Sequence, residues 1–332
     1  MLNITLFYEK KSDEAETLIT ELEKLKEEFA FSLFQIDIQD DPVVFEKYKN
    51  KTPVLIVGPY TLTNPINVRD LRVSLGAAKD RNDHLNQITD KNYQKKLSQS
   101  KKATNSDRLG YWFSKHFMLV FNLIIFLYVG LPFLAPVLMK TGLTGPGKLI
   151  YTIYSPLCHQ LAFRSWFLFG EQGYYPRAVA NISGVETYEQ ISGQQTIDIL
   201  EARKFIGNEQ LGYKVALCER DIAIYGAILL FGIIFALSKN RFKPIPWYIW
   251  IVVGLVPIGF DGVSQLPGLM ANVPEWLPLR ESTPFLRSLT GGLFGLTTAW
   301  YLFPLIEFSM HETREILFRK ISIDNANQVS NR

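Results

Sequence analysis

Residues 117–139 read FMLVFNLIIFLYVGLPFLAPVLM and contain no charged side chain. Because a helix rises about 1.5 Å per residue, this run is long enough to cross a hydrocarbon core of roughly 30 Å. Three further stretches are apolar and long enough to be considered with it. The sequence therefore predicts an α-helical polytopic membrane domain with four spans, at 116–139, 222–238, 245–260 and 288–306.

The average composition of the whole chain does not show that apolar and charged residues are concentrated in different segments. The 332 residues are 47% hydrophobic and 20% charged, with a net charge of +3, values that are also typical of soluble proteins. Residues 1–108 hold much of the Lys, Asp and Glu, and no basic stripe interleaved with aromatic residues is evident. We therefore expect the lipid bilayer as a partner and no nucleic acid.

The distribution of basic residues predicts the orientation in the cell membrane. Lysines and arginines crowd the approach to the first span, the link 239–243 and the segment 314–320. With four spans, all three positions fall on one side, which the positive-inside rule assigns to the cytoplasm. Both termini are therefore expected to be cytoplasmic, and both cysteines are expected on the outer side.

The apolar stretch 149–169 carries His159 and Arg164 and has Pro156 in its middle. If it crossed the membrane, the basic segments would lie on opposite sides. We therefore expect an interfacial or re-entrant helix on the outer side, followed by an outer loop or lid at 170–217.

Residues 1–80 show the alternation of short strands and helices that is typical of a soluble α/β domain. The expected order is β-α-β-α-β-β-α, with strands rich in β-branched and aromatic residues and with Ser12 or Asp13 as a helix cap. The remaining parts are a basic linker at 81–112, a transmembrane domain at 113–310 and a cytoplasmic tail at 311–332. The expected elements are strands at 3–8, 31–38, 53–57 and 60–62, and helices at 13–29, 42–48 and 68–78.

This order of elements resembles the glutaredoxin branch of the thioredoxin fold, in which Thr52–Pro53 would occupy the place of the cis-proline. The active-site cysteines of that family are missing, because Lys10, Lys11, Ser12 and Asp13 stand where they would be. No cysteine precedes Cys158, which excludes dithiol exchange by this domain. We consider two roles for it, a module that binds a protein partner and a solubilising or regulatory remnant.

Polar side chains gather where the predicted spans meet the outer surface. An ionisable residue at membrane depth is costly, so it usually lines a cavity, a pathway or a contact with a partner. Asp221 begins one predicted span and Asp261 ends another, at the same outer level. The motifs in chain order are Cys158-His159 with Arg164-Ser165, Cys218-Glu219-Arg220-Asp221 with Tyr225, Asp261-Gly262 with Gln265, and Arg280-Glu281-Ser282-Thr283 with Arg287 and Thr290-Gly291.

These motifs, between residues 155 and 305, resemble a family of small prokaryotic membrane proteins that is known as domain of unknown function 2085. The chain departs from the family pattern in one place, since residues 171–217 are inserted between Gly170 and Cys218. The resemblance implies a membrane protein and brings no established activity. The chemistry must therefore be argued from the residues.

One reading is a metal site. Cys158, His159, Cys218 and either Asp221 or Asp261 offer thiolate, imidazole and carboxylate ligands, a set that suits Zn²⁺. An open coordination position would let the metal activate water. In this reading Asp221, Asp261 and His159 are the candidate catalytic groups.

A second reading is a structural disulfide between Cys158 and Cys218, because two cysteines on an oxidising outer face often pair. A catalytic version, a membrane thiol-redox protein, is disfavoured by the lack of any Cys-x-x-Cys.

A third reading gives the main role to four arginines. Guanidinium groups bind phosphate and carboxylate bidentately, so a cluster of them would suit a lipid headgroup or a prenyl-linked phosphate. The alternative is that these arginines pair with Glu219, Asp221, Asp261 and Glu281 or anchor the protein at headgroups. The four residues are Arg164, Arg220, Arg280 and Arg287.

The leading hypothesis from the sequence is an outward-facing site that handles an anionic lipid or lipid-linked substrate with help from a metal ion. Its main alternative is a non-enzymatic accessory or scaffold subunit of a membrane complex, with a Cys158–Cys218 disulfide. The sequence leaves open whether the protein is an enzyme.

Overall fold

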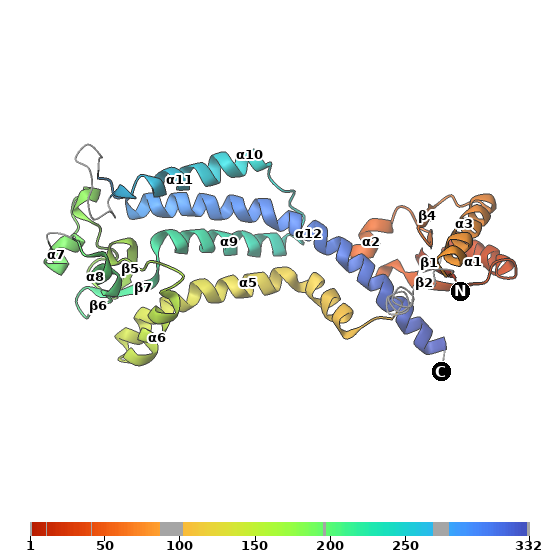
Figure 1. Cartoon of the computed structure of the whole chain (residues 1–332), viewed down its shortest axis with the longest axis horizontal. Helices are drawn as coiled ribbons and strands as arrows, with labels where there is room; N and C mark the ends of the chain where they lie inside the picture. The colour runs from red at the N-terminus through yellow and green to blue at the C-terminus, as the bar shows by residue number, and fades with distance from the viewer. Residues whose placement is uncertain are drawn as a thin grey trace. The chain divides into compact units, whose positions relative to one another are not determined.

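The computed structural model describes residues 2–10, 12–40, 42–86, 102–194, 197–267 and 279–330 (Figure 1). The chain divides into two compact units. The first consists of Met1–Lys115 with Ser309–Arg332, and the second of His116–Phe308. Each unit is described by itself.

The first unit holds a four-stranded mixed sheet in the order β2-β1-β3-β4. Strand β1 pairs with β2 in parallel and with β3 antiparallel, and β3 pairs antiparallel with β4. The predicted order of elements is confirmed, and the Thr52–Pro53 peptide is cis as expected. The likeness to glutaredoxins stays a prediction. The elements are β1 (Leu2–Tyr8), α1 (Asp13–Leu25), β2 (Phe31–Asp37), η1 (Ile38–Asp40), α2 (Pro42–Tyr48), β3 (Val54–Val57), β4 (Tyr60–Thr63) and α3 (Val68–Asn86).

The two faces of this sheet are covered by different elements, because side chains alternate between faces along a strand. Ile4 and Leu6 of β1 pack in a cluster with apolar residues of α1 and α3. Phe7 belongs to a second cluster with residues of α2, and Phe318 packs against it. Phe318 lies in helix α12 (Pro284–Ser330), so the last turns of that helix help to cover the second face.

The segment expected to be a cytoplasmic tail is thus helical as far as Ser330. Tyr48 Oη donates a hydrogen bond to Glu315 Oε1 at 2.6 Å, and Lys320 Nζ lies 2.7 Å from Asp107 Oδ2. Helix α3 continues beyond its expected end at Ala78 to Asn86. Residues 87–101 of the predicted basic linker lie outside the described residues.

Within the described residues, three helices are long and apolar enough to cross a membrane. These are α5 (Asn105–Lys140), α9 (Glu219–Leu237) and the part of α12 at Pro284–Asn325. Their apolar side chains are largely exposed, as for Leu119 at 65% and Phe126 at 59%, so the helices need an apolar environment such as lipid. The remaining predicted span, at 245–260, corresponds to the shorter apolar helix Trp247–Val263. This helix is made of α10 (Trp247–Ile249), η4 (Trp250–Leu255) and α11 (Val256–Val263).

The predicted interfacial helix at 149–169 is wrong over most of its length. Helix α6 (Thr144–Tyr154) ends just before Pro156, whose missing N–H prevents it from continuing the helical hydrogen bonds. The chain then forms the short helix η2 (Ala162–Arg164) and the strand β5 (Ser165–Leu168). The apolar residues after Pro156 thus enter a sheet and not a helix.

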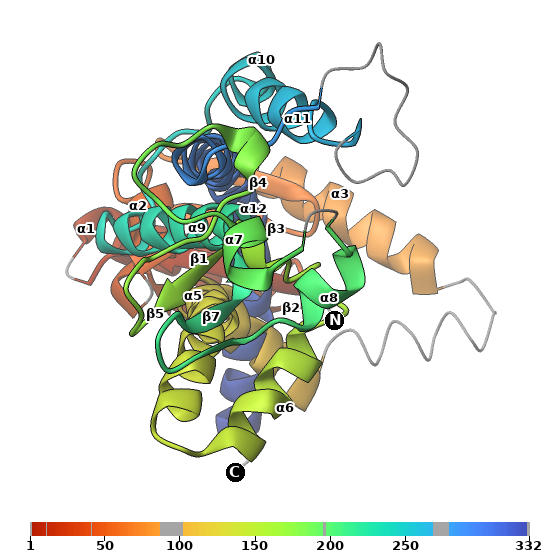
Figure 2. The same cartoon turned by 90° about the vertical axis from the view of Figure 1, so that its left-hand side faces the viewer.

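The end of the second unit that carries α6 is a small folded cap (Figures 1 and 2). Its three-stranded antiparallel sheet has the order β5-β7-β6, with β6 at Gly207–Asn208 and β7 at Gly212–Cys218. Phe163, Phe167, Tyr175 and Tyr188 form an aromatic core beside it. The cap also contains η3 (Ala178–Ala180), α7 (Tyr188–Ser192) and α8 (Ile199–Lys204).

Helices α9 and α12 approach each other closely at glycines of α12. A Cβ atom on Gly295 would lie 2.1 Å from the backbone oxygen of Ile224, and one on Gly291 would lie 2.8 Å from that of Arg220. Only glycine permits such contacts, so these two positions fix the start of α9 against α12. This places Arg220 of α9 and Arg287 of α12 at the same end of the helices.

Candidate functional site

The second unit contains a cavity of about 300 Å³ between the cap and the ends of the helices, which we call the thiol cavity. Its walls come from the segment after α6, from η2, from the junction of β7 and α9, from the turn after α11 and from α12. The lining residues are Leu157, Cys158, His159, Arg164, Cys218, Arg220, Asp221, Gln265 and Arg287.

Two buried cysteines and an aspartate form the first part of this site. Cys218 ends β7 and caps α9, so its Sγ accepts a hydrogen bond from the Asp221 amide at 3.5 Å. Cys158 Sγ accepts one from the Cys218 amide at 3.3 Å. The two sulfur atoms and a carboxylate oxygen of Asp221 all lie within 4.8 Å of one another. This is the spacing of side chains that can share one metal ion.

The surroundings of Cys218 favour the protonated form of its thiol. A hydrogen bond with Cys158 and burial both raise the pKa of the Cys218 thiol well above its usual value. Both cysteines are free in this structure, so the disulfide considered from the sequence is not formed in it.

His159 lies next to this group but is not part of it. Its Nδ1 accepts a hydrogen bond from the Leu161 amide at 3.3 Å, and neither ring nitrogen belongs to the cysteine–aspartate group. Desolvation and the positive charges of Arg164 and Arg287 lower the pKa of His159 to about 3. The imidazole is therefore neutral at physiological pH.

A buried cluster of ion pairs forms the wall opposite the thiols. Arg164 holds Glu281 with two parallel hydrogen bonds, from Nε at 2.7 Å and from Nη2 at 2.9 Å. Arg287 contacts the same carboxylate and also donates to Glu219 Oε2 at 3.0 Å. Arg287, Glu219 and Glu281 are each at most 2% exposed. Nη1 of Arg177 also lies 3.8 Å from Glu281 Oε2, so three guanidinium groups compensate the charges of the two buried carboxylates.

Asp261 is the centre of a second, more exposed cluster. It is 3% exposed and pairs with Arg220, while Arg280 Nη2 lies 3.4 Å from its other oxygen. Gln265 connects the two clusters, because its Nε2 donates to Asp261 Oδ2 at 3.2 Å and its Oε1 accepts from Arg287 at 3.5 Å. Asp261 therefore contacts two residues of the cavity wall, Arg220 and Gln265. Neither Asp261 nor Arg280 lines the cavity itself.

Several buried polar atoms of these clusters have no hydrogen-bond partner within the protein. They are Nε of Arg220, Nε of Arg287 and Oε1 of Glu219. Buried donors are almost always satisfied by protein, water or ligand. Arg220 and Arg287 also line the thiol cavity.

The structure brings seven of the nine residues singled out from the sequence to one cavity. Asp261 and Arg280 lie behind its wall, and the metal-ligating set reduces to Cys158, Cys218 and Asp221. Arg164, Arg220, Arg280 and Arg287 all pair with carboxylates, which is the arrangement weighed above against an anion-binding role.

Sequence reasoning missed Gln265 as the link between the clusters, and it missed Lys214. Lys214 is only 1% exposed and stands in the middle of β7, whose sequence is GYKVALC. A lysine inside an otherwise apolar strand is itself a signal, since lysine is almost never fully buried unless its charge is satisfied.

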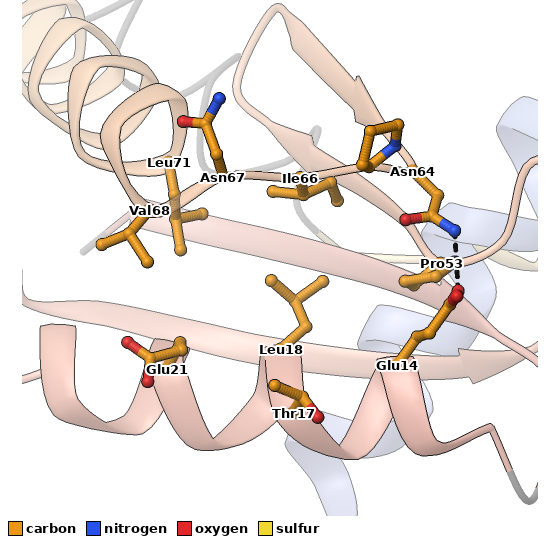
Figure 3. A pocket seen from close by; sticks show the side chains of 11 residues that line it. Glu14, Thr17, Leu18, Glu21, Pro53, Asn64, Ile66, Asn67, Val68 and Leu71 are labelled. Atoms are coloured by element: carbon orange, nitrogen blue, oxygen red, sulfur yellow. Dashed lines mark hydrogen bonds between the residues drawn. The ribbon is translucent and has the colours of Figure 1, made fainter.

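The first unit has a separate groove of about 450 Å³ between α1 and the segment leading into α3 (Figure 3). Leu18, Ile66 and Leu71 contribute apolar side chains, and Pro53 lies at one end. Asn64 Nδ2 donates to Glu14 Oε2 at 2.7 Å across that end. The groove contains no thiol among its described residues, which fits the loss of the cysteines expected in glutaredoxins.

Comparison with known proteins finds that part of the chain is similar to a membrane-protein family. Residues 204–301 match the family model described as "Predicted membrane protein (DUF2085)", the family that the motifs resemble. The matched segment includes Cys218, Asp221 and Arg287 and leaves Cys158 and His159 outside it. A relative in Methanocaldococcus jannaschii, "Uncharacterized protein MJ1492", is 27% identical over 199 residues, which are 58% of this chain and 92% of that protein.

Proposed function

We propose that the thiol cavity is a zinc site at the non-cytoplasmic face of a polytopic cell-membrane protein, and that it handles the anionic group of a lipid or lipid-linked substrate. The observation that carries the proposal is the meeting of Cys158, Cys218 and Asp221 with three arginine side chains in one cavity. The metal ligands and the anion-binding groups would then act on the same bound molecule.

The ligand set supports zinc. Zinc binds thiolate sulfur at about 2.3 Å and carboxylate oxygen at roughly 2.0–2.2 Å, so neighbouring ligand atoms around it lie about 3.3–3.8 Å apart. The present separations, all within 4.8 Å, need only small side-chain rotations to reach this geometry. The raised pKa of Cys218 makes binding weaker at low pH but does not prevent it, because a coordinating thiol loses its proton to the charge of the metal.

Three protein ligands leave one position of a tetrahedral zinc ion open, as in catalytic zinc sites. An oxygen of a phosphate or carboxylate group can take that position, where the metal polarises it. Arg220 and Arg287 line the same cavity, so their guanidinium groups would attract the other oxygens of such a group. His159 lies on the cavity wall as a neutral imidazole, and its low pKa makes it a weak base for taking up a proton.

The orientation follows from charge and from the four-span arrangement. Lysines and arginines of 239–243 and 314–320 would lie in the cytoplasm, together with the N-terminal unit. The cap and the thiol cavity would then face outward, next to the outer leaflet. An anionic lipid headgroup is the class of substrate that is abundant at this depth.

Metal analysis of the full chain tests this proposal. The protein is purified in a mild detergent without chelators, and its zinc content is measured by mass spectrometry of the metal. We expect about one zinc per chain in the natural protein and loss of the metal in Cys158→Ser and Asp221→Asn. His159→Ala and Asp198→Asn are matched controls that should retain it, since Asp198 caps α8 and does not line the cavity.

Two results would overturn the proposal. One is a natural protein that remains monodisperse and holds no stoichiometric metal. The other is full metal content in Cys158→Ser. A rise in intact mass on reduction of the natural protein would instead favour the scaffold with a Cys158–Cys218 disulfide.

A further inference from the structure

A second cavity of the same unit has a volume of about 570 Å³ and shares no lining residue with the thiol cavity. We call it the basic cavity, because four of its lining residues are cationic and no carboxylate occurs among the described residues that line it. Its walls belong to α6, α8 and β7. The cationic residues are Lys148, Arg203, Lys204 and Lys214, with the hydroxyl groups of Thr152 and Ser155 beside them.

Lys214 is the buried cation of this cavity. Its Nζ donates hydrogen bonds to the carbonyl oxygens of Gln160 at 2.8 Å and Arg203 at 2.6 Å. It has no carboxylate partner in the described part of the chain. Burial lowers the pKa of Lys214 to about 7, as expected for an ammonium group without a compensating charge. An anion bound beside Lys214 would supply the compensating charge.

Arg203 adds a positioned guanidinium group. Its Nη2 donates to the carbonyl oxygen of Ser155 at 2.5 Å and to Ser155 Oγ at 2.7 Å. These bonds fix the side chain between α8 and the end of α6 and use one of its three nitrogens. Like Lys214, Arg203 makes no ion pair with a described residue, so its charge is available to a ligand.

The position of the cavity favours a membrane lipid as the source of the anion. Lys148, Thr152 and Ser155 follow one another at helical spacing and contribute to the cavity. The neighbouring face carries Leu149 and Ile153, which are 59% and 54% exposed, and Leu157 just beyond the helix end is 56% exposed. Such an exposed apolar stripe beside basic residues is typical of a helix that lies in the membrane interface.

We propose that the basic cavity binds the phosphate group of an anionic lipid, with Lys214 and Arg203 as its main contacts and with acyl chains along the apolar stripe of α6. The proposal does not rest on the zinc site. Lys148 and Lys204, which are exposed, line the same cavity and would add long-range attraction for the headgroup.

Lipid binding to the purified full chain tests the proposal. Native mass spectrometry compares added phosphatidylglycerol, zwitterionic phosphatidylcholine and inorganic phosphate. We expect phosphatidylglycerol to bind at least about tenfold more tightly than phosphatidylcholine, and Lys214→Met and Arg203→Gln each to weaken it about tenfold. Lys148→Gln, at an exposed position that does not threaten folding, should weaken it about threefold. Lys140→Gln is the matched control, an exposed lysine that pairs with Glu209 and does not line the cavity.

Equal binding of the two lipids by the natural protein would overturn the proposal, and so would unchanged binding in Lys148→Gln and Arg203→Gln. Binding of inorganic phosphate without preference for phosphatidylglycerol would overturn the assignment to a lipid. Zinc content is measured on the same samples. Loss of lipid selectivity with zinc retained identifies the basic cavity as the lipid site, whereas absent zinc with intact selectivity contradicts only the proposed zinc site.

Discussion

The thiol cavity and the basic cavity are both lined by cationic side chains, yet the charges of those side chains are satisfied in opposite ways. Arg164, Arg220 and Arg287 of the thiol cavity each pair with a buried carboxylate. Lys214 and Arg203 of the basic cavity donate to neutral carbonyl and hydroxyl oxygens, and no carboxylate is among the described residues around them.

This difference separates two uses of positive charge near a membrane. A guanidinium group that is buried with a carboxylate mainly joins parts of the fold, because removing either partner leaves an uncompensated charge. Glu281 indeed joins η2 and α12 through Arg164 and Arg287. A cation surrounded by neutral acceptors keeps its charge for a ligand. The paired arginines of the thiol cavity should therefore attract an anion less strongly than their number suggests, and the proposed zinc ion would supply much of the attraction there.

The largest effect should follow from Glu281→Gln, which removes one charge from the buried cluster. Arg164 and Arg287 would share the remaining carboxylate of Glu219, and the free energy of unfolding should fall by about 3–5 kcal/mol. Reversible unfolding in mixed detergent micelles measures this change. Glu209→Gln is the control at an exposed glutamate, and an equal loss there would contradict the role given to the buried cluster.

A smaller loss is expected for Asp261→Asn. Arg220 and Arg280 are 22% and 43% exposed, so water can solvate both after the carboxylate is removed. We expect a loss of roughly 1–3 kcal/mol in the same unfolding measurement. A loss as large as that of Glu281→Gln would mean that the Asp261 cluster is as tightly enclosed as the Glu281 cluster.

A third effect is the pH dependence of stability at Lys214, which is small for each single pH unit. Its pKa is about 7 in the folded protein and near 10.5 when unfolded, so between these values the unfolded state binds the extra proton. Raising the pH from 7 to 10 therefore favours the folded state, by on the order of 1 kcal/mol per pH unit. Lys214→Met removes this contribution, so its stability relative to the natural protein should fall steadily as the pH rises.

Unfolding of the natural protein and of Lys214→Met at pH 7, 8, 9 and 10 measures the difference between their free energies of unfolding. Lys140→Met serves as a control at an exposed lysine of the same unit. Parallel pH profiles of the natural protein and Lys214→Met would contradict the picture of Lys214 as a buried cation without a counter-ion.

The sequence predicts well those features that depend on local patterns. The uncharged run 117–139 predicts a membrane helix by its length alone, and alternating β-branched residues predict the strands of the first unit. The helix expected at 149–169 fails because apolar runs fit a buried strand as well as a helix. The pairing of β5 with β7, which decides between them, involves residues about fifty positions apart.

For the site too, the sequence predicts what depends on local patterns and misses what depends on contacts between distant residues. Motifs at the ends of predicted spans indicated which residues would meet, since membrane depth restricts where ionisable groups can lie. They could not indicate that His159 would stand outside the cysteine–aspartate group, because one backbone turn decides the direction of its ring. Nor could they reveal the basic cavity, whose residues come from α6, α8 and β7 and share no motif.

The central claim, a zinc ion held by Cys158, Cys218 and Asp221, is tested most directly by X-ray absorption at the zinc edge. The measurement uses the full chain purified without chelators. We predict two sulfur neighbours at about 2.3 Å and two oxygen or nitrogen neighbours at roughly 2.0–2.2 Å, with the sulfur signal lost in Cys158→Ser. Zinc surrounded only by oxygen and nitrogen would contradict it.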